Sequence, residues 1–195
     1  MDHVFKIFSE YLTFRLTDHI YTTEDSVRYV FFASLLQSLK LSPNDVILEY
    51  PHDVIKRAKI DTFIPGLNNS SIAIEFKYDR KIPSGKNSPK PQKAGKLFND
   101  IRRLLLFKQS EDIQCYFIYL TDEEMNAYLT NQNNKLKDFY CIEPHNSLRI
   151  DANYIANKSK TFQQSVGGEL VGTLTCVMSE TLPCNHFLRV YSVVS

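Results

Sequence analysis

The segment from residue 59 to residue 77 restricts the possible fold more than any other part of the chain. Two apolar stretches flank a turn-forming group of Pro, Gly and Asn residues between positions 65 and 69. This pattern predicts a β-hairpin. Both arms carry charge where a buried strand should be apolar, because Asp61 lies in the first arm and Glu75 and Lys77 lie in the second.

The spacing of these charges predicts which of them meet. Side chains alternate between the two faces of a strand, so Glu75 and Lys77 share one face. A turn centred on Asn68 places Asp61 opposite Glu75, with Cβ atoms roughly 5 Å apart. Two carboxylates at that separation repel each other unless a cation lies between them. The hairpin therefore predicts a metal site beside Lys77; the alternative is an exposed surface hairpin with ion pairs between Asp61 and Lys59.

Length and composition indicate one globular domain over residues 1–195. The chain has 195 residues, of which 43% are hydrophobic and 23% charged, as in ordinary globular proteins. No secretory signal and no apolar run of about 18 residues is present, so we expect a cytoplasmic protein without a membrane partner. Cys115 lies in an apolar run and is expected in the core. Cys176, Cys184 and His186 offer zinc ligands, but their spacing fits no common zinc pattern.

The charge is distributed unevenly along the chain, although the net charge is only +1. Residues 77–108 contain ten basic and two acidic residues, so this segment carries +8 and the remainder carries −7. A localised basic segment indicates contact with a polyanion such as DNA, with a solvated charged loop as the alternative. The predicted nucleic-acid contacts are the following basic residues: Arg80, Lys81, Lys86, Lys90, Lys93, Lys96 and Arg103.

The periodicity of apolar residues predicts alternating helices and strands. Helices are expected at 3–16, from about 22 to before Pro43, at 94–108, and from a capping box at 121–124 to the asparagines at 131–134. Strands are expected at 46–50, 58–64, 71–78, 113–120, 147–150, 170–178 and 187–194, the last two paired around Pro183. Residues 80–96 are expected to form a mobile loop because they are rich in Pro, Gly and Ser. This order predicts an α/β sandwich with a central mixed β-sheet flanked by helices.

Asp61 followed by Glu75-Phe76-Lys77 resembles the active-site signature of the PD-(D/E)xK nuclease superfamily. A helix, a hairpin, a helix and an apolar strand over residues 20–130 also resemble the common core of that family. The resemblance implies a restriction endonuclease-like fold over this core. It does not cover residues 145–195, where the sequence pattern predicts a β-rich extension. One departure is Ile60, which stands where the family pattern has proline.

The resemblance also implies roles for individual residues. Asp61 and Glu75 would ligate Mg²⁺, or alternatively Mn²⁺, together with the backbone carbonyl of Phe76. Lys77 would orient or activate the attacking water and offset charge on the phosphorane. Glu24, near the start of the second helix, would be an accessory acid; a role in stabilising the helix dipole is the alternative, and Glu49 is the reserve candidate.

The expected function is a Mg²⁺-dependent endonuclease that hydrolyses phosphodiester bonds in DNA, in restriction, defence or repair. Cutting both strands requires two sites, so a homodimer or a partner in a larger nuclease complex is expected. The alternatives are an inactive nuclease-fold protein that binds nucleic acid or protein, and an unrelated α/β protein whose acidic surface docks a partner. The sequence contains no HExxH, GxSxG or P-loop pattern, so other catalytic classes lack support.

Overall fold

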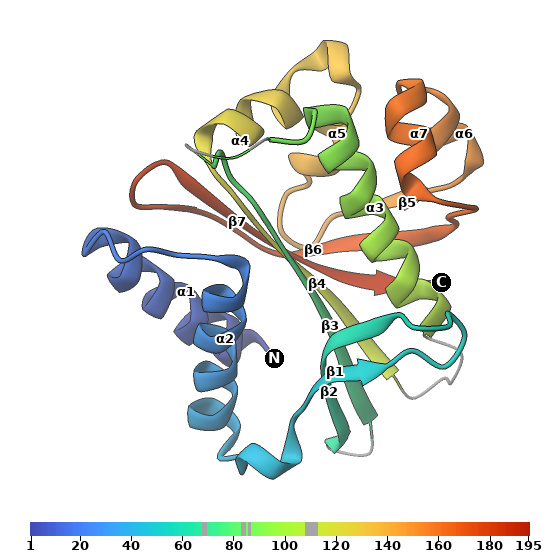
Figure 1. The fold of residues 1–195 in the computed structure, drawn as a ribbon. Coiled ribbons are helices and arrows are strands. Elements are labelled where there is room, and N and C mark those ends of the chain that lie inside the picture. Colours follow the sequence, from blue (N-terminus) through green and yellow to red (C-terminus); the bar gives the residue numbers. More distant parts are fainter. Residues whose placement is uncertain (68–69, 83–84, 86, 108–112) are drawn as a thin grey trace.

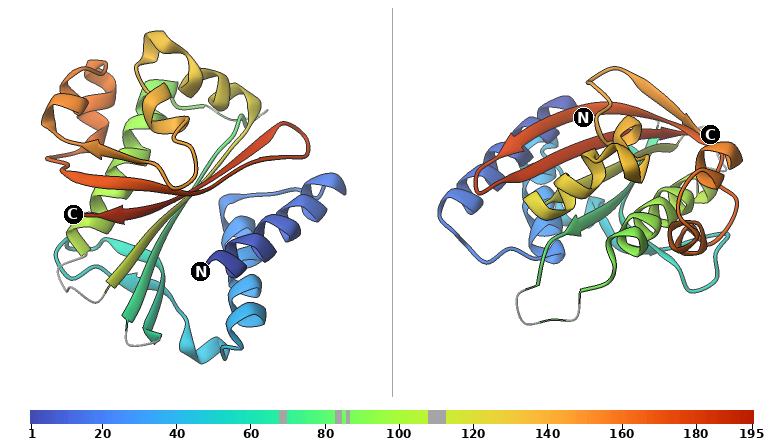
Figure 2. Two further views of the ribbon diagram at one scale, coloured as in Figure 1. Left: turned by 180° about the vertical axis from the view of Figure 1, so that it is seen from behind. Right: turned by 90° about the horizontal axis from the view of Figure 1, so that it is seen from above.

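A seven-stranded mixed sheet forms the centre of the molecule (Figures 1 and 2). The computed structural model describes residues 1–67, 70–82, 85, 87–107 and 113–195. The strands follow the spatial order β1-β2-β3-β4-β7-β6-β5, and among them only β3 and β4 run parallel. Their bounds are Ile47–Pro51 (β1), Lys59–Leu67 (β2), Ser70–Asp79 (β3), Ile113–Thr121 (β4), Ser147–Ile150 (β5), Gly172–Leu182 (β6) and His186–Val194 (β7).

Helices cover both faces of the sheet, which confirms the predicted α/β sandwich (Figure 1). One face carries two helices, α1 (Asp2–Thr17) and α2 (Glu24–Leu39). The other face carries α3 (Lys90–Phe107), α4 (Glu123–Thr130), α5 (Lys137–Tyr140), α6 (Ala152–Ala156) and α7 (Lys160–Val166). Two 3₁₀ turns, Pro43–Asp45 and Gln132–Asn134, lie in the connections.

Each face of the sheet has its own aromatic core. Beneath α1 and α2, the ring of Phe31 meets those of Phe8 and Phe76 at centroid distances of 5.2 and 5.3 Å. Beneath α3, the ring of Phe98 meets those of Phe139 and Phe162 at 4.8 and 5.0 Å. Edge-to-face and tilted contacts at these distances stabilise aromatic cores. The two cores hold the end of β3 between the first turn of α2 and the middle of α3.

The N-terminal helices begin and end close to their predicted bounds. Thr23 caps α2, because its hydroxyl accepts a hydrogen bond from the Ser26 amide at 3.2 Å and the Ser26 hydroxyl accepts from the Thr23 amide. This reciprocal cap fixes the first turn of the helix. The cap of α4 differs from the prediction, since Asp122 replaces Thr121 as the capping residue. Thr121 instead ends β4.

The prediction of a mobile loop reaching to residue 96 was wrong. Helix α3 begins at Lys90, four residues before the predicted start at residue 94, so Lys90, Lys93 and Lys96 lie on a helix. Pro91 was interpreted as a helix breaker, but proline is tolerated in the first turn, where its missing N–H has no intrahelical partner. The Lys93 amide donates to the Pro89 carbonyl at 3.0 Å, which closes that first turn.

The C-terminal segment completes the sheet. Strands β6 and β7 form the predicted hairpin around Pro183, and β7 pairs with β4 over most of its length. Helices α6 and α7 were not predicted; α7 packs against α3, where Gly95 allows close approach to the Phe162 carbonyl.

Cys115 is buried, as expected for a core thiol. Among the helices of the described ranges, none combines the length and apolar character needed to cross a bilayer.

Candidate active site

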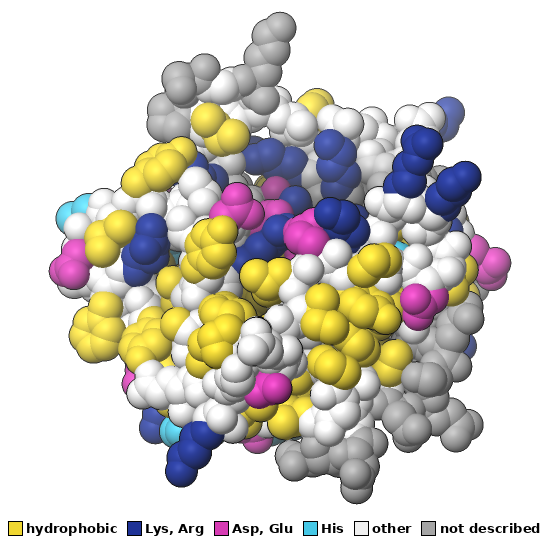
Figure 3. Space-filling view, turned by 60° about the horizontal axis from the view of Figure 1, so that its bottom comes forward, with side chains coloured by type: hydrophobic (Ala, Val, Ile, Leu, Met, Phe, Trp, Pro, Cys, Tyr) yellow, Lys and Arg dark blue, Asp and Glu magenta, His cyan; other side chains and the backbone are white. Residues whose placement is uncertain are grey.

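A highly charged cavity of about 350 Å³ lies where β1, β2 and β3 meet α2 and α3. Figure 3 shows acidic and basic side chains gathered around a hollow in this face of the molecule. Ten of the twelve lining residues are charged, five acidic and five basic. The acidic set is Glu24, Glu49, Asp61, Glu75 and Asp100, and the basic set is Arg28, Arg57, Lys59, Lys77 and Arg103. All four predicted catalytic residues therefore line one cavity.

The hairpin register brings Asp61 and Glu75 together. Strand β2 pairs with β3 through Thr62 and Ile74, and continuation of this register by one residue places Asp61 opposite Glu75. Asp61 is only 6% exposed and Glu75 is fully buried. The alternative of an exposed hairpin face is thus wrong. The structure does not bring Cys176, Cys184 and His186 together as zinc ligands, since the described residues contain no group of three or more metal-ligating side chains.

Burial of the two carboxylates raises the pKa of both groups. Burial, and after it the neighbouring Asp61 carboxylate, raises the pKa of Glu75 well above its ordinary value. Burial also raises the pKa of Asp61, although the Phe76 amide, which donates to Asp61 Oδ2 at 2.8 Å, opposes that rise. Desolvation and mutual repulsion both disfavour the charged form. A further cation between these groups would relieve that cost.

Arg28 lies among four carboxylates at the entrance to the site. Its Nη2 atom lies 2.9 Å from Asp61 Oδ1 and 3.3 Å from Glu24 Oε1. Its Nη1 atom lies 3.1 Å from Glu49 Oε1 and 3.6 Å from Asp25 Oδ1. The sequence prediction missed Arg28, although its position four residues after Glu24 is the spacing of an ion pair on a helix.

Arg103 pairs with Glu75 from the opposite side of the site. Its Nη2 atom lies 2.6 Å from Glu75 Oε2, and its Nε atom donates to Glu75 Oε1 at 3.3 Å. A two-point guanidinium–carboxylate pair of this kind is strong and directional. Asp100, one turn earlier on α3, lies 3.3 Å from Arg103, and burial raises the pKa of this aspartate to about 6. Arg103 was predicted to contact nucleic acid, but its guanidinium points into the cavity.

Glu24 connects the first turn of α2 to the end of β3. Its Oε2 atom accepts a hydrogen bond from Lys77 Nζ at 3.3 Å and another from the Tyr78 amide at 2.9 Å. Burial alone would lower the pKa of Lys77, but Glu24, Asp100 and Asp79 outweigh it and raise that pKa above 10.5. Lys77 is therefore an ammonium ion at neutral pH, held in place by Glu24.

Glu49, the reserve candidate for the accessory acid, extends the row of carboxylates onto the edge strand. Strand β1 pairs with β2 through Leu48 and Thr62 and through Tyr50 and Ile60, so Glu49 lies opposite Asp61. Its backbone φ of 55° is in the left-handed region, which is unusual for a residue other than glycine. Its carboxylate meets Arg28 and, at 3.4 Å, Lys59. Glu49 is thus exposed at the rim, whereas Glu24 contacts Lys77.

The oxygen donors of this cavity match the ligand preference of magnesium. Asp61 and Glu75 supply adjacent carboxylates, and Phe76, whose carbonyl was predicted as a further ligand, also lines the cavity. Within the described ranges, no group of three or more His, Cys, Asp and Glu side chains is arranged to hold a metal ion. Mg²⁺, however, usually takes only one or two protein carboxylates and keeps several waters. The donor set therefore fits Mg²⁺, provided that Arg28 and Arg103 yield their positions near the carboxylates.

The other predicted nucleic-acid contacts lie along one end of α3 and the segment before it. Lys81 and Lys90 pair with Glu124 at 3.6 and 3.0 Å. Lys93 donates to the Arg80 carbonyl at 2.9 Å. Surface ion pairs of this kind contribute little to stability, so these side chains can exchange partners with a polyanion.

The last two predicted nucleic-acid contacts are Lys96 and Lys86. Lys96 is exposed on α3, on a helix face away from the aromatic core. Lys86 lies outside the described residues. Four of the predicted contacts with a described position line one pocket at the start of α3: Arg80, Lys81, Lys90 and Lys93. Arg103 lies apart from them, in the charged cavity.

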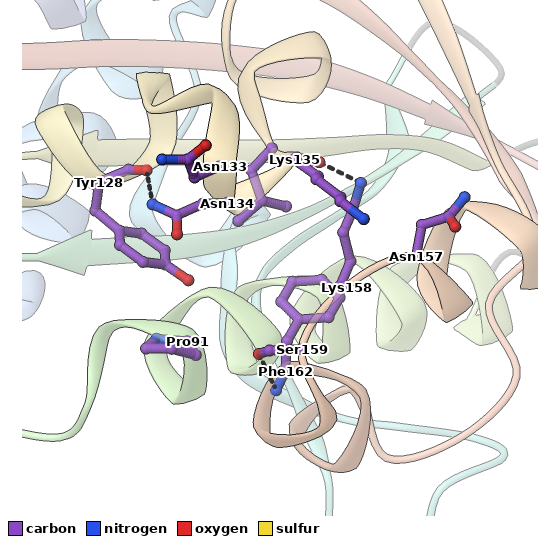
Figure 4. Close-up of a pocket in the computed structure, with 10 residues that line it drawn as sticks. Pro91, Tyr128, Asn133, Asn134, Lys135, Asn157, Lys158, Ser159 and Phe162 are labelled. Atoms are coloured by element: carbon purple, nitrogen blue, oxygen red, sulfur yellow. Dashed lines mark hydrogen bonds between the residues drawn. The ribbon is translucent and has the colours of Figure 1, made fainter.

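A separate pocket of about 330 Å³ lies between α3, α4 and α7 (Figure 4). It is lined by amide, lysine and aromatic side chains and contains none of the predicted catalytic residues. Its Lys158 ammonium is bonded to the Lys135 carbonyl and lies 3.6 Å from the centroid of the Tyr154 ring. Because the lysine is held by its own chain and no carboxylate lines the pocket, catalytic chemistry is better supported at the charged cavity.

Comparisons with known proteins do not add to this description. The chain matches no family model, no curated protein and no solved structure.

Proposed function

We propose that the protein is a Mg²⁺-dependent nuclease that hydrolyses phosphodiester bonds in DNA, with a site similar to that of the PD-(D/E)xK nucleases. The observation that carries this proposal is the convergence of Asp61, Glu75 and Lys77 on one charged cavity. The hairpin of β2 and β3 brings these three residues together, and α2 adds Glu24, which is distant in the sequence. Buried like charges are costly unless they serve chemistry or are paired.

Lys77 is the group best placed to stabilise the transition state. It is held as an ammonium ion by Glu24 at 3.3 Å, which favours electrostatic stabilisation of the phosphorane over proton abstraction. Bound Mg²⁺ would lower the pKa of its water and polarise the scissile phosphate. Asp61 and Glu75 would hold the ion, and Glu24 would position Lys77 rather than contact the reacting atoms.

Arg28 and Arg103 have a second role in this proposal. In the structure they neutralise Asp61 and Glu75. The Nε atom of Arg28 is buried and has no hydrogen-bond partner among the described residues. A buried donor without a partner is unfavourable, and a phosphate oxygen would satisfy it. When the carboxylates bind a metal ion, both guanidinium groups become available to the DNA backbone, together with the lysines of α3.

The experiment is a nicking assay with supercoiled plasmid in the presence of Mg²⁺, and of a chelator. Asp61→Asn and Glu75→Gln keep the side-chain size and remove the proposed ligands. Lys59→Ala is the matched control, because Lys59 lies at the rim and pairs only with Glu49 among the described carboxylates. We expect nicking by the parent and by the control, and none by the other two variants. Equal nicking by all four proteins would overturn the site assignment.

A second candidate is a nuclease-fold protein that binds nucleic acid or another protein without cleaving it. The observation that favours it is that guanidinium groups already pair with both proposed metal ligands. The two candidates differ in metal binding. Calorimetric titration with Mg²⁺ and Mn²⁺ should show binding that Glu75→Gln abolishes if the protein is a nuclease, and no binding if it is a binding module. Double-strand cleavage requires a homodimer or a larger complex, and the molecular mass of the protein in solution tests whether one forms.

A further inference from the structure

Another pocket, of about 300 Å³, is lined by aromatic, basic and apolar residues together with Asp122. We call it the aromatic pocket and define it by four of its lining side chains: Tyr21, Tyr78, Arg80 and His186. None of them belongs to the catalytic set proposed above. The pocket lies where the connection between α1 and α2 meets the end of β3 and the β6–β7 hairpin.

Tyr21 is an exposed ring on a fixed backbone. The residue is 71% exposed although its ring contacts Arg80, so part of the ring surface is accessible to a ligand. Its carbonyl accepts a hydrogen bond from Arg15 Nη2 at 2.7 Å, and Arg15 Nε donates to the hydroxyl of the next residue, Thr22, at 3.0 Å. Because α1 holds this connection through Arg15, binding a flat ligand on Tyr21 requires little further ordering.

The rings of Tyr78 and His186 form another wall of the pocket. The Tyr78 and His186 rings have centroids 5.8 Å apart. His186 Nδ1 lies 2.9 Å from the Cys184 carbonyl, so this nitrogen is the donor, and His186 Nε2 accepts from the Tyr78 hydroxyl at 2.7 Å. Burial raises the pKa of Tyr78 to about 12, so the hydroxyl keeps its proton at neutral pH. The two rings of this wall are therefore held together by a hydrogen bond.

Arg80 joins the two walls. Its guanidinium carbon lies 4.7 Å from the Tyr21 ring centroid and 5.8 Å from the Tyr78 ring centroid. Its Nη2 atom donates to the Tyr21 hydroxyl at 2.7 Å. A planar cation beside an exposed ring is a combination with which proteins bind single-stranded nucleic acids, since a base stacks on the ring and the cation meets the backbone. Tyr21 is the exposed ring here, whereas Tyr78 is only 9% exposed.

The aromatic pocket and the charged cavity have no lining residue in common among the described residues, but the end of β3 and the residues around the start of α2 contribute to both. Tyr78 directly follows Lys77 in β3, and its amide donates to Glu24, which lines the cavity. Tyr21 lies three residues before Glu24. A nucleotide chain that crosses the end of β3 would therefore place one phosphate in the cavity and a neighbouring base in the aromatic pocket.

We infer that the aromatic pocket binds an unpaired nucleobase, and that the substrate of the proposed nuclease has a single-stranded segment next to the cleaved bond. In a duplex the base faces are covered by neighbouring base pairs, so only an unpaired base can stack on Tyr21. Stacking accepts every base, which predicts weak sequence preference at this position. The inference rests on the proposed function for the position of the cleaved bond, whereas base binding stands on the pocket alone.

The test is fluorescence anisotropy of a labelled single-stranded oligonucleotide in the presence of a chelator, so that cleavage does not interfere. Loss of one base–aromatic stack, worth about 1–3 kcal/mol, predicts that Tyr21→Ala weakens binding about 5- to 150-fold. Tyr21→Phe keeps the ring and should bind as the parent does. Phe14→Ala is the matched control, because Phe14 is a similarly exposed ring, 66% accessible, that does not line the pocket.

Two further ligands sharpen the test. The same sequence as RNA should lose a similar factor with Tyr21→Ala, because stacking does not distinguish the sugars, and the blunt duplex should lose almost nothing. Unchanged single-strand binding by Tyr21→Ala, or an equal loss on the duplex, would overturn the inference. If this variant weakens single-strand binding but the parent cleaves nothing with any divalent metal ion, the aromatic pocket stands and the nuclease proposal fails.

Discussion

The Arg103–Glu75 pair offers the most informative single perturbation of the site. Glu75 is fully buried and Arg103 meets both of its oxygens, at 2.6 and 3.3 Å. Replacing Arg103 with Met keeps most of the volume and leaves the carboxylate buried without its partner. Breaking a buried ion pair in this way costs about 3–5 kcal/mol. Because Arg103 is itself 25% exposed, we expect a loss near 3 kcal/mol, the lower end of that range.

The assay is urea unfolding of the parent and of Arg103→Met, first with a chelator and then with Mg²⁺. If Asp61 and Glu75 hold the metal, Mg²⁺ replaces the lost positive charge. The ion should then stabilise Arg103→Met more than the parent, and the variant should gain about 2.7 kcal/mol over its own metal-free form when the Mg²⁺ concentration is about 100 times the Kd of the variant. The neighbouring variant Arg102→Met is the control; Arg102 lies towards the surface and donates to the Glu169 carbonyl, so its change should stay within about 0.5 kcal/mol.

Two results would refute this reasoning. A loss below about 1 kcal/mol for Arg103→Met would mean that Glu75 does not depend on its partner. The double variant Arg103→Met/Glu75→Gln removes both charges and should recover much of the stability, because no buried charge remains. If the double variant is as unstable as the sum of the single changes, the two side chains act independently.

Three further predictions concern stability. Burial raises the pKa of Asp100 from 3.8 to about 6, so the folded protein holds this proton more tightly than the unfolded chain. The contribution of this proton to the free energy of unfolding is present at low pH and is lost as the pH rises from about 4 to 6. In urea unfolding, Asp100→Asn should reduce this pH-dependent loss of stability by about 3 kcal/mol. A loss as large as that of the parent would contradict the prediction. Gly95→Ala would place Cβ 2.5 Å from the Phe162 carbonyl, so we expect a loss of about 1–3 kcal/mol; a gain, as in an exposed helix, would show that α7 does not pack there. Thr23→Ala removes the cap of α2 and should lower the thermal midpoint through a loss of about 1 kcal/mol, whereas Thr23→Ser should not.

Much of the site could be predicted from the sequence of the hairpin alone. The prediction assumed a symmetrical turn, and the alternation of side chains then places Asp61 beside Glu75. The hairpin has a register shift between Ile64 and Leu67, but the pairing nearer the site is the predicted one. The observed pairing of Thr62 with Ile74 has this register. The buried face also follows, because apolar residues surround each charge along the strands. Local geometry was therefore sufficient to predict a contact wherever two neighbouring strands determine it.

The partners of these carboxylates could not be predicted in the same way. The contact between Arg103 and Glu75 depends on how α3 crosses the sheet, which is set by packing of Phe98 and its neighbours rather than by spacing in the sequence. Helix α7 is short and is stabilised by its contact with Gly95, and short helices have little intrinsic stability. The early start of α3 was missed because Pro91 is compatible with a first turn.

The measurement that tests the central claim most directly is the single-turnover rate at which the protein cleaves one labelled DNA in Mg²⁺, compared between the parent and Lys77→Ala. Lys77 lies in the cavity beside Glu24, and loss of one such electrostatic contact typically slows a reaction about 10²- to 10³-fold. We predict a decrease of that size for Lys77→Ala, an unchanged rate for Lys59→Ala, and no cleavage by any protein in chelator. Cleavage by Lys77→Ala at the rate of the parent would contradict the assignment of this cavity as the active site.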